Sequence, residues 1–129
     1  MIVVDTSVWI GARRDPALAR TLDSLLDADE VALALPVRLE LWAGTARKDR
    51  PAFDAAFSAL AQVIPDDGTW RRMNDAIARA ADAGEHFAFV DMLIGVLAAD
   101  TGALVWSLDA DFERMERLGL VSRFDPPLH

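Results

Sequence analysis

The sequence contains no cysteine, which excludes both a disulfide framework and a thiolate metal site. It contains only two histidines, and this scarcity argues against a zinc centre. No apolar run reaches the roughly 18 residues that a membrane-spanning helix needs, and Asp5 interrupts the first apolar run before it resembles a secretion signal. These absences favour a cytoplasmic location.

Basic residues are also scarce. The chain has 13 Lys and Arg residues against 21 Asp and Glu residues, and its net charge is −8. Such an excess of acid argues against broad, non-specific binding to nucleic acid, which relies on a basic surface. Acids that gather in a metal pocket would lower the net charge without changing the rest of the surface, so their positions decide what the charge means.

The remaining composition is that of a globular protein. With 129 residues, 53% of them hydrophobic, the sequence predicts one domain over residues 1–129. Short apolar runs alternate with stretches of helical spacing, which predicts an α/β fold with a parallel sheet and helices on both faces. The expected strands are 1–4, 31–35, 61–64 and 103–106, with a short fifth beginning at Leu120–Val121. The expected helices are 17–27, one from Pro36, 51–60, 69–83, 89–100 and 111–118, the last ending at Gly119.

Four carboxylates stand beside apolar runs. Asp5 and Asp109 follow the first and fourth expected strands, where parallel α/β sheets bind their ligands. Glu40 lies one turn into the helix after the second strand, and Asp91 lies in FVDMLIGVLAAD, which has scarcely another polar residue. Isolated buried carboxylates are costly or become protonated. Convergence on a divalent cation removes that cost, and oxygen ligands favour Mg²⁺ or Mn²⁺.

Simpler interpretations of these acids remain open. Asp5 and Asp109 are suited to cap the helices that follow them, and Glu40 is suited to a solvated helix face. Asp91 has almost no polar face to belong to. Asp111 competes with Asp109 for the fourth place, but its position favours a supporting role beside the ligands or a place in the first turn of the next helix.

The same residues resemble a known family. MIVVDTSVWI, the acid in PVRLELWAG, then FVDMLIGVLAAD and SLDADFERM occur in the order found in PIN domains, and the chain is similar to the VapC toxins of bacterial and archaeal toxin–antitoxin pairs. The resemblance implies a three-layer α/β/α sandwich around a central parallel sheet of strand order 3-2-1-4-5. It also implies an Mg²⁺- or Mn²⁺-dependent endoribonuclease, usually a homodimer, that a cognate antitoxin holds inactive.

The resemblance also implies roles for individual residues. The acidic quartet of the family falls on Asp5, Glu40, Asp91 and Asp109. Asp5 and Asp91 are expected to bind the metal directly, and Asp109 directly or through a water. Glu40 is expected to hold a metal-bound water or to act as a base. A metal-activated water as nucleophile predicts products with 5′-phosphate and 3′-hydroxyl ends.

Two hydroxyl residues match positions beside that quartet. Ser7 follows Asp5 by two residues, and Ser107 precedes Asp109 by two residues. His86, in GEHFAF, matches no functional position of the family, and we expect a loop or packing residue there.

Basic residues near the acids are candidates for contacts to RNA phosphates. Twelve of the thirteen are arginine, whose fork matches a phosphate group. Solvated helix faces and surface salt bridges are the competing interpretation for every one of them. The candidates are Arg13, Arg14, Arg38, Arg47, Lys48 and Arg50, with Arg71 and Arg72 as a further pair.

Rival classes fit the sequence less well. A response-regulator receiver needs paired acids after its first strand and a lysine near its last strands, whereas the one lysine here is Lys48. A haloacid-dehalogenase phosphatase needs D-x-D after the first strand, where this chain has Ser7. The main alternative is a PIN-like module with weak catalysis that binds RNA or a partner.

Overall fold

The computed structural model describes residues 1–127. Its strands are β1 (Ile2–Val4), β2 (Val31–Ala34), β3 (Ala61–Val63) and β4 (Leu104–Trp106). Its helices are α1 (Thr6–Gly11), α2 (Pro16–Asp27), α3 (Leu35–Ala43), α4 (Arg50–Phe57), α5 (Asp67–Asp82), α6 (Phe89–Asp100) and α7 (Asp111–Arg117), and a 3-10 turn, η1 (Arg47–Asp49), precedes α4. No helix among these residues is long and apolar enough to span a membrane.

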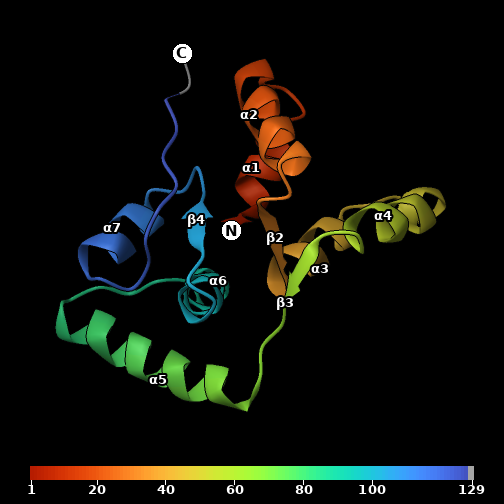
Figure 1. Cartoon of the computed structure of the whole chain (residues 1–129). Helices are drawn as coiled ribbons and strands as arrows, with labels where there is room; N and C mark the ends of the chain where they lie inside the picture. Colours follow the sequence, from red (N-terminus) through yellow and green to blue (C-terminus); the bar gives the residue numbers. More distant parts are fainter. Residues whose placement is uncertain (128–129) are drawn as a thin grey trace.

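The strands form one parallel sheet in the order β3-β2-β1-β4, with β1 between β2 and β4. In Figure 1 the N-terminus, which leads into β1, lies between the labelled strands β4 and β2. This order confirms the expected arrangement of the first four strands. Parallel strands that lie next to each other bring their carboxyl ends to one edge. The residues that follow β1 and β4 therefore meet there, and these residues include Asp5 and Ser107.

The fifth strand expected at Leu120–Val121 is reduced to a single bridge slightly further along the chain. An isolated parallel bridge joins Val105 to Arg123, at the place beside β4 that a fifth strand would take. Leu120 is used instead to end α7, because its N–H donates to the carbonyl of Met115 at 2.9 Å. Gly119, at φ 72°, supplies the left-handed turn that this helix end requires.

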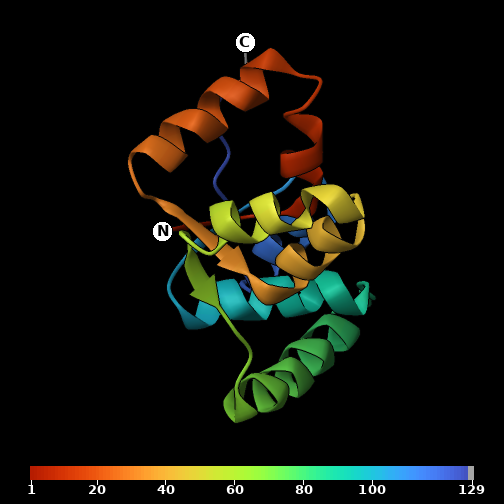
Figure 2. The ribbon, with the colours of Figure 1, turned by 90° about the vertical axis from the view of Figure 1, so that its right-hand side faces the viewer.

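Two hydrophobic clusters cover the two faces of the sheet and make the three layers. Alternate residues of β1 face opposite sides, as in any strand. Ile2 and Val4 pack with α1 and α2, whereas Val3 belongs to the larger cluster formed with α3, α5, α6 and α7. Figure 2 shows α1 and α2 on one side of the sheet and α6 with α5 beyond it on the other.

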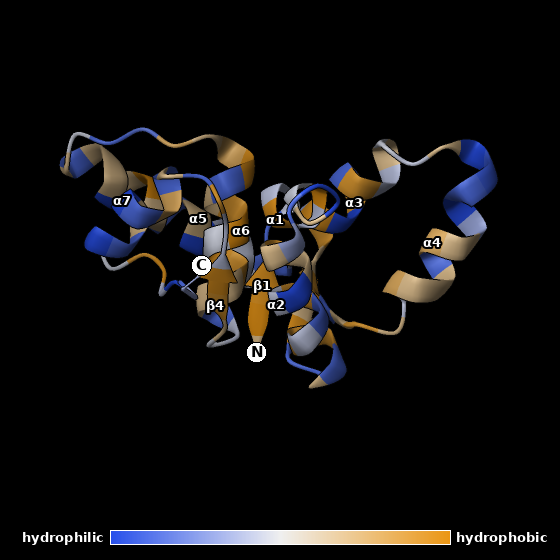
Figure 3. Ribbon diagram, turned by 90° about the horizontal axis from the view of Figure 1, so that it is seen from above, coloured by the Kyte–Doolittle hydropathy of each residue, from blue (hydrophilic) through white to orange (hydrophobic). Residues whose placement is uncertain are grey.

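Helix α6 is the buried helix that its sequence predicts, with the expected bounds. Every residue from Met92 to Ala98 is buried, and the ribbon of α6 is mostly orange, like that of β1, in Figure 3. Its packing against α5, α7 and the sheet fixes its first turn in space. Asp91 lies in that turn, so the fold holds this carboxylate at a defined place.

Candidate metal centre

Asp5 follows β1 directly and is 7% exposed. It occupies the N-cap position of α1, but its side chain makes no capping hydrogen bond. Its Oδ2 atom instead accepts hydrogen bonds from the hydroxyls of Ser7 and Ser107, each at 2.8 Å. Capping is therefore not what the buried carboxylate does.

The two serines connect the ends of β1 and β4. Their hydroxyls lie 3.3 Å apart. Ser7 Oγ accepts the N–H of Leu108, and Ser107 Oγ accepts the N–H of Asp109, both at 3.0 Å. The hydroxyls therefore orient Asp5 and, at the same time, the turn that carries Asp109.

Asp91 is half-buried in the first turn of α6. Burial raises the pKa of its carboxyl group from 3.8 to about 6, and the negative charges of Asp109, Asp5, Asp111 and Glu40 act in the same direction. The other three acids expected from the sequence, and Asp111, therefore lie close enough to Asp91 to influence its carboxyl group. The raised pKa of Asp91 thus reflects both its burial and the negative charge around it.

Asp91, Asp109 and Asp111 each offer a carboxylate oxygen, and these oxygens all lie within 4.8 Å of one another. Asp109 is exposed, and its Oδ1 accepts the N–H of Asp111 at 2.9 Å, which closes the turn before α7. Asp111 is half-buried at the first position of α7, as expected. Its carboxylate nevertheless belongs to the same group as those of Asp91 and Asp109, although the sequence predicted only a supporting role for it.

Glu40 lies at the rim of this group. It is exposed on α3, on a helix whose Val37 and Leu41 are buried against the sheet. Its Oε1 accepts the hydroxyl of Thr6 at 3.3 Å. Glu40 is thus solvated, and it also contributes to the negative potential at Asp91.

The basic residues expected to contact RNA differ in whether their side chains are already paired within the protein. Arg38 pairs with Asp54 at 3.4 Å, and the guanidinium of Arg50 lies 4.1 Å from the centre of the Trp42 ring. The others are exposed in the turn after α1 and in η1: Arg13, Arg14, Arg47 and Lys48.

Two further residues named in the sequence analysis, Arg72 and His86, lie outside the acidic group. Arg72 of α5 pairs with Asp100 at 2.5 Å and with Asp66 at 3.5 Å, so its charge is already compensated. His86 is exposed in the linker between α5 and α6, in keeping with the loop role expected for it.

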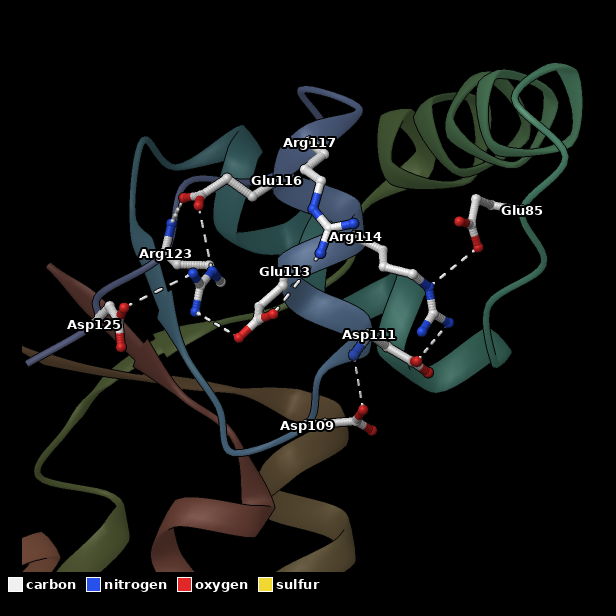
Figure 4. A network of polar contacts seen from close by, with 9 residues as sticks. All are labelled: Glu85, Asp109, Asp111, Glu113, Arg114, Glu116, Arg117, Arg123 and Asp125. Carbon is white, nitrogen blue, oxygen red and sulfur yellow. Dashed lines mark hydrogen bonds and ion pairs between the residues drawn. The ribbon is translucent and has the colours of Figure 1, made fainter.

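Sequence reasoning missed Arg114. Its Nη2 lies 2.6 Å from Asp111 Oδ1, and its Nε lies 3.1 Å from Glu85 Oε2 (Figure 4). The spacing of three residues between Asp111 and Arg114 was the available signal, because such residues neighbour each other on a helix. The contact with Glu85 has no comparable signal in the sequence.

The donor set fits a hard divalent cation. Every candidate ligand is a carboxylate oxygen, as Mg²⁺ and Mn²⁺ prefer. The repulsion that contributes to the raised pKa of Asp91 is the interaction that a bound cation would relieve. The group can therefore bind a cation beside Asp91 and bring it next to a substrate at the exposed side of Asp109.

Known proteins are similar to this chain in sequence and in fold. Ribonuclease VapC18 of Mycobacterium tuberculosis (strain ATCC 25618 / H37Rv) is 32% identical over 117 residues, which are 87% of this chain and 85% of that protein. VapBC2 from Rickettsia felis, in a crystal structure bound to a DNA fragment from its promoter, gives a TM-score of 0.77 at 16% identity and covers 96% of this chain and 98% of that one. VapBC-5 of Mycobacterium tuberculosis, a member of the VapBC family of toxin–antitoxin systems, gives 0.65 at 24% identity and covers 95% and 97%.

The family follows from a match over nearly the whole chain. The family model of the PIN domain matches residues 2–118, which include β1 at the centre of the sheet, all five acids and helix α7. The structural neighbours above share the fold at low identity, and the curated relative shares sequence over the same region. This chain belongs to the PIN domain family.

Proposed function

We propose that this chain is a metal-dependent endoribonuclease and the toxin of a toxin–antitoxin pair. The observation that carries the proposal is the half-buried Asp91, whose pKa is raised by burial and by four further carboxylates. Similarity to a ribonuclease at 32% identity supports RNA as the substrate. We also propose that the protein acts in the cytoplasm, on the strength of the proposed RNA substrate.

We propose Asp5, Asp91 and Asp109 as ligands of the cation, with Asp111 beside them. Mg²⁺ or Mn²⁺ would supply the positive charge that polarises a phosphoryl oxygen, lowers the pKa of a water and stabilises the leaving oxygen. The hydroxyls of Ser7 and Ser107 hold Asp5 through one oxygen and leave the other for binding.

Glu40 is suited to handle a proton. Its Oε1 is oriented by the hydroxyl of Thr6, and the side chain is exposed at the rim of the acidic group. We propose that its second oxygen, Oε2, accepts the proton of the attacking water. Attack by water on phosphorus, with the 3′-oxygen as leaving group, gives 5′-phosphate and 3′-hydroxyl ends.

Phosphates on either side of the cleaved bond need positive partners, because the acidic group repels them. The exposed residues after α1 and in η1 are our candidates, and Arg38 would have to exchange Asp54 for a phosphate. The proposed set is Arg13, Arg14, Arg38, Arg47, Lys48 and Arg50.

An antitoxin protein is the partner that we propose, on the basis of the likeness to VapBC2 and VapBC-5. We also propose a homodimer through an apolar face. A groove lined by residues of α3, α5 and α6 is edged by Leu39, Trp70 and Val90, which are 55%, 49% and 40% exposed. Exposed apolar patches of this kind mark interaction sites.

Sedimentation measures the oligomeric state and so tests the proposed dimer directly. Leu39→Asp with Trp70→Asp should convert a dimer to a monomer, because charge in an apolar interface is costly. Ile10→Asp is the control, since Ile10 is 49% exposed on α1, which covers the opposite face of the sheet. A wild-type chain that sediments as a monomer at all concentrations contradicts the proposal.

Cleavage of a purified RNA tests the main proposal against a module that binds RNA without cutting it. We expect cleavage with Mn²⁺ or Mg²⁺, none with a chelator, and none with Asp5→Asn in the same metal. Mapping of the product ends should find 5′-phosphates. RNA binding without cleavage in either metal would favour the binding module.

A further inference from the structure

Arg114 bridges two segments that carry acids of the metal centre. It lies on α7, and its Nη2 contacts Asp111 Oδ1 at 2.6 Å. Its Nε contacts Glu85 Oε2 at 3.1 Å, and the guanidinium lies 5.4 Å from the centre of the Phe87 ring. Glu85 and Phe87 belong to the linker that leads into α6, the helix of Asp91, so this side chain connects α7 to the segment just before α6 (Figure 4).

The other arginines in that region do not reach the acidic group. Arg117 lies about one turn further along α7. Among the described residues it pairs only with Glu113, at 3.9 Å, and 71% of its side chain is exposed. Arg123 pairs with carboxylates on α7 and with Asp125. Within residues 1–127, Arg114 is the one cationic side chain that forms an ion pair with Asp5, Glu40, Asp91, Asp109 or Asp111.

We propose that Arg114 is a positioning residue of the metal centre: its guanidinium, fixed between Asp111 and Glu85, holds the carboxylate of Asp111 beside Asp91 and Asp109 so that Asp111 takes part in cation binding. The inference rests on the proposed function. The planar, rigid guanidinium donates to Asp111 through Nη2 and to Glu85 through Nε, so it fixes the Asp111 carboxylate more strictly than the flexible point charge of a lysine would. The second contact, to Glu85, prevents the fork from turning with Asp111.

The sign of the effect separates positioning from simple charge. A positive side chain beside a cation site repels the cation, so removal of its charge alone would tighten metal binding. If the fork instead holds Asp111 in place, its removal weakens metal binding, because the carboxylate is free to leave the group. The two roles of Arg114 therefore predict opposite changes in one measured constant.

Calorimetric titration of the chelator-treated protein with Mn²⁺ measures that constant. For Arg114→Met we expect a dissociation constant raised by about tenfold, the usual effect of losing a residue that orients a ligand. Arg114→Lys keeps the charge but loses the fork, and we expect binding weaker than wild type there as well. Arg117→Met removes the same charge from the same helix at an exposed pair, so its constant should stay within about twofold of wild type.

Unchanged or tighter Mn²⁺ binding by Arg114→Met overturns the inference. If that variant does not fold, as judged by circular dichroism in chelator, Arg114→Lys decides, and wild-type affinity there overturns it equally. A double-mutant cycle adds a second criterion. Asp111→Asn should weaken binding in the wild-type background and have little further effect in Arg114→Met, whereas additive losses contradict the proposed coupling.

The titration also distinguishes this inference from the function on which it rests. If the wild-type protein binds no Mn²⁺, or if Asp91→Asn binds Mn²⁺ as tightly as wild type does, both the metal centre and the inference are wrong. Binding that depends on Asp91 but not on Arg114 leaves the proposed function intact and overturns the role of Arg114 alone.

Discussion

The hydroxyl of Ser107 donates a hydrogen bond to Oδ2 of Asp5 at 2.8 Å, although 102 positions of sequence separate the two residues. The bond joins the carboxyl end of β4 to that of β1. Ser7 donates to the same oxygen, and Oδ1 accepts no hydrogen bond from the part of the chain that the structure describes. One oxygen of Asp5 is thus fixed by the protein, and the other is available to a ligand.

Ser107→Ala should lower Mn²⁺ affinity or cleavage rate by about 10-fold to 100-fold, the range found when a group that orients a metal ligand is lost. Ser7→Ala should have a smaller effect, since Ser107 still holds the carboxylate and, unlike Ser7, also accepts the N–H of Asp109, a proposed ligand. The measurement is the Mn²⁺ dependence of RNA cleavage. Ser24→Ala is the matched control, because Ser24 is exposed on α2. Equal activity in Ser107→Ala and Ser24→Ala would remove Ser107 from the site.

Divalent metal should raise the melting temperature of the wild-type protein. A ligand that binds only the folded state stabilises it by RT ln(1 + [L]/Kd), and here the ligand also relieves repulsion among carboxylates. Asp91→Asn should lose this response while retaining the fold. Melting curves with Mn²⁺, Mg²⁺ and chelator check both statements. A wild-type melting temperature that neither metal moves argues against the site.

The stability of the metal-free protein should depend on pH through Asp91. The pKa of this carboxyl rises from 3.8 to about 6 on folding, so the folded chain binds the proton more tightly than the unfolded chain. The stabilisation from that proton is fully present below the unfolded value and is lost as pH rises through the folded value. Asp91→Asn, which does not titrate, should therefore gain in melting temperature relative to wild type as pH rises towards about 6.

That difference between wild type and Asp91→Asn, measured in chelator across the acidic range, isolates one group from the other acids. It should grow with pH and then level off. A difference that stays constant over the whole range means that Asp91 titrates at its ordinary pKa.

Asp109→Asn and Asp111→Asn should both reduce cleavage, Asp109→Asn more severely. Asp109 is the exposed acid at the carboxyl end of β4, whereas Asp111 begins α7 and is held by Arg114. Cleavage rates at saturating Mn²⁺ rank them, and chelator melting curves show whether either change affects the fold. If Asp111→Asn is inactive and Asp109→Asn active, the fourth acid of the quartet is Asp111.

Local patterns were enough to predict most of the scaffold. The apolar run of α6 and the alternation of short strands with helices are properties of contiguous residues, and both predict elements that the structure contains. The same logic placed Asp5 at the end of β1, because the apolar run stops at this carboxylate and a buried strand stops with it. Gly119 likewise ends α7 through a local requirement for positive φ.

Contacts between distant segments could not be predicted in this way. The fork of Arg114 depends on where the linker before α6 passes α7, and no spacing in the sequence encodes that approach. The proximity of Asp111 to Asp91 has the same origin. The prediction of a fifth strand was wrong for a related reason. Leu120 hydrogen-bonds to the end of α7, and beyond α7 the described chain pairs with β4 only through a bridge at Arg123.

The most direct test of the central claim is the cleavage rate of one purified RNA at saturating Mn²⁺, measured for wild type and for Asp91→Asn. The claim is that carboxylates gathered around Asp91 hold a cation that cleaves RNA. It predicts cleavage by wild type and no detectable cleavage by Asp91→Asn, with both proteins folded. A rate for Asp91→Asn within about tenfold of wild type, less than the loss of a metal ligand should cause, would contradict it.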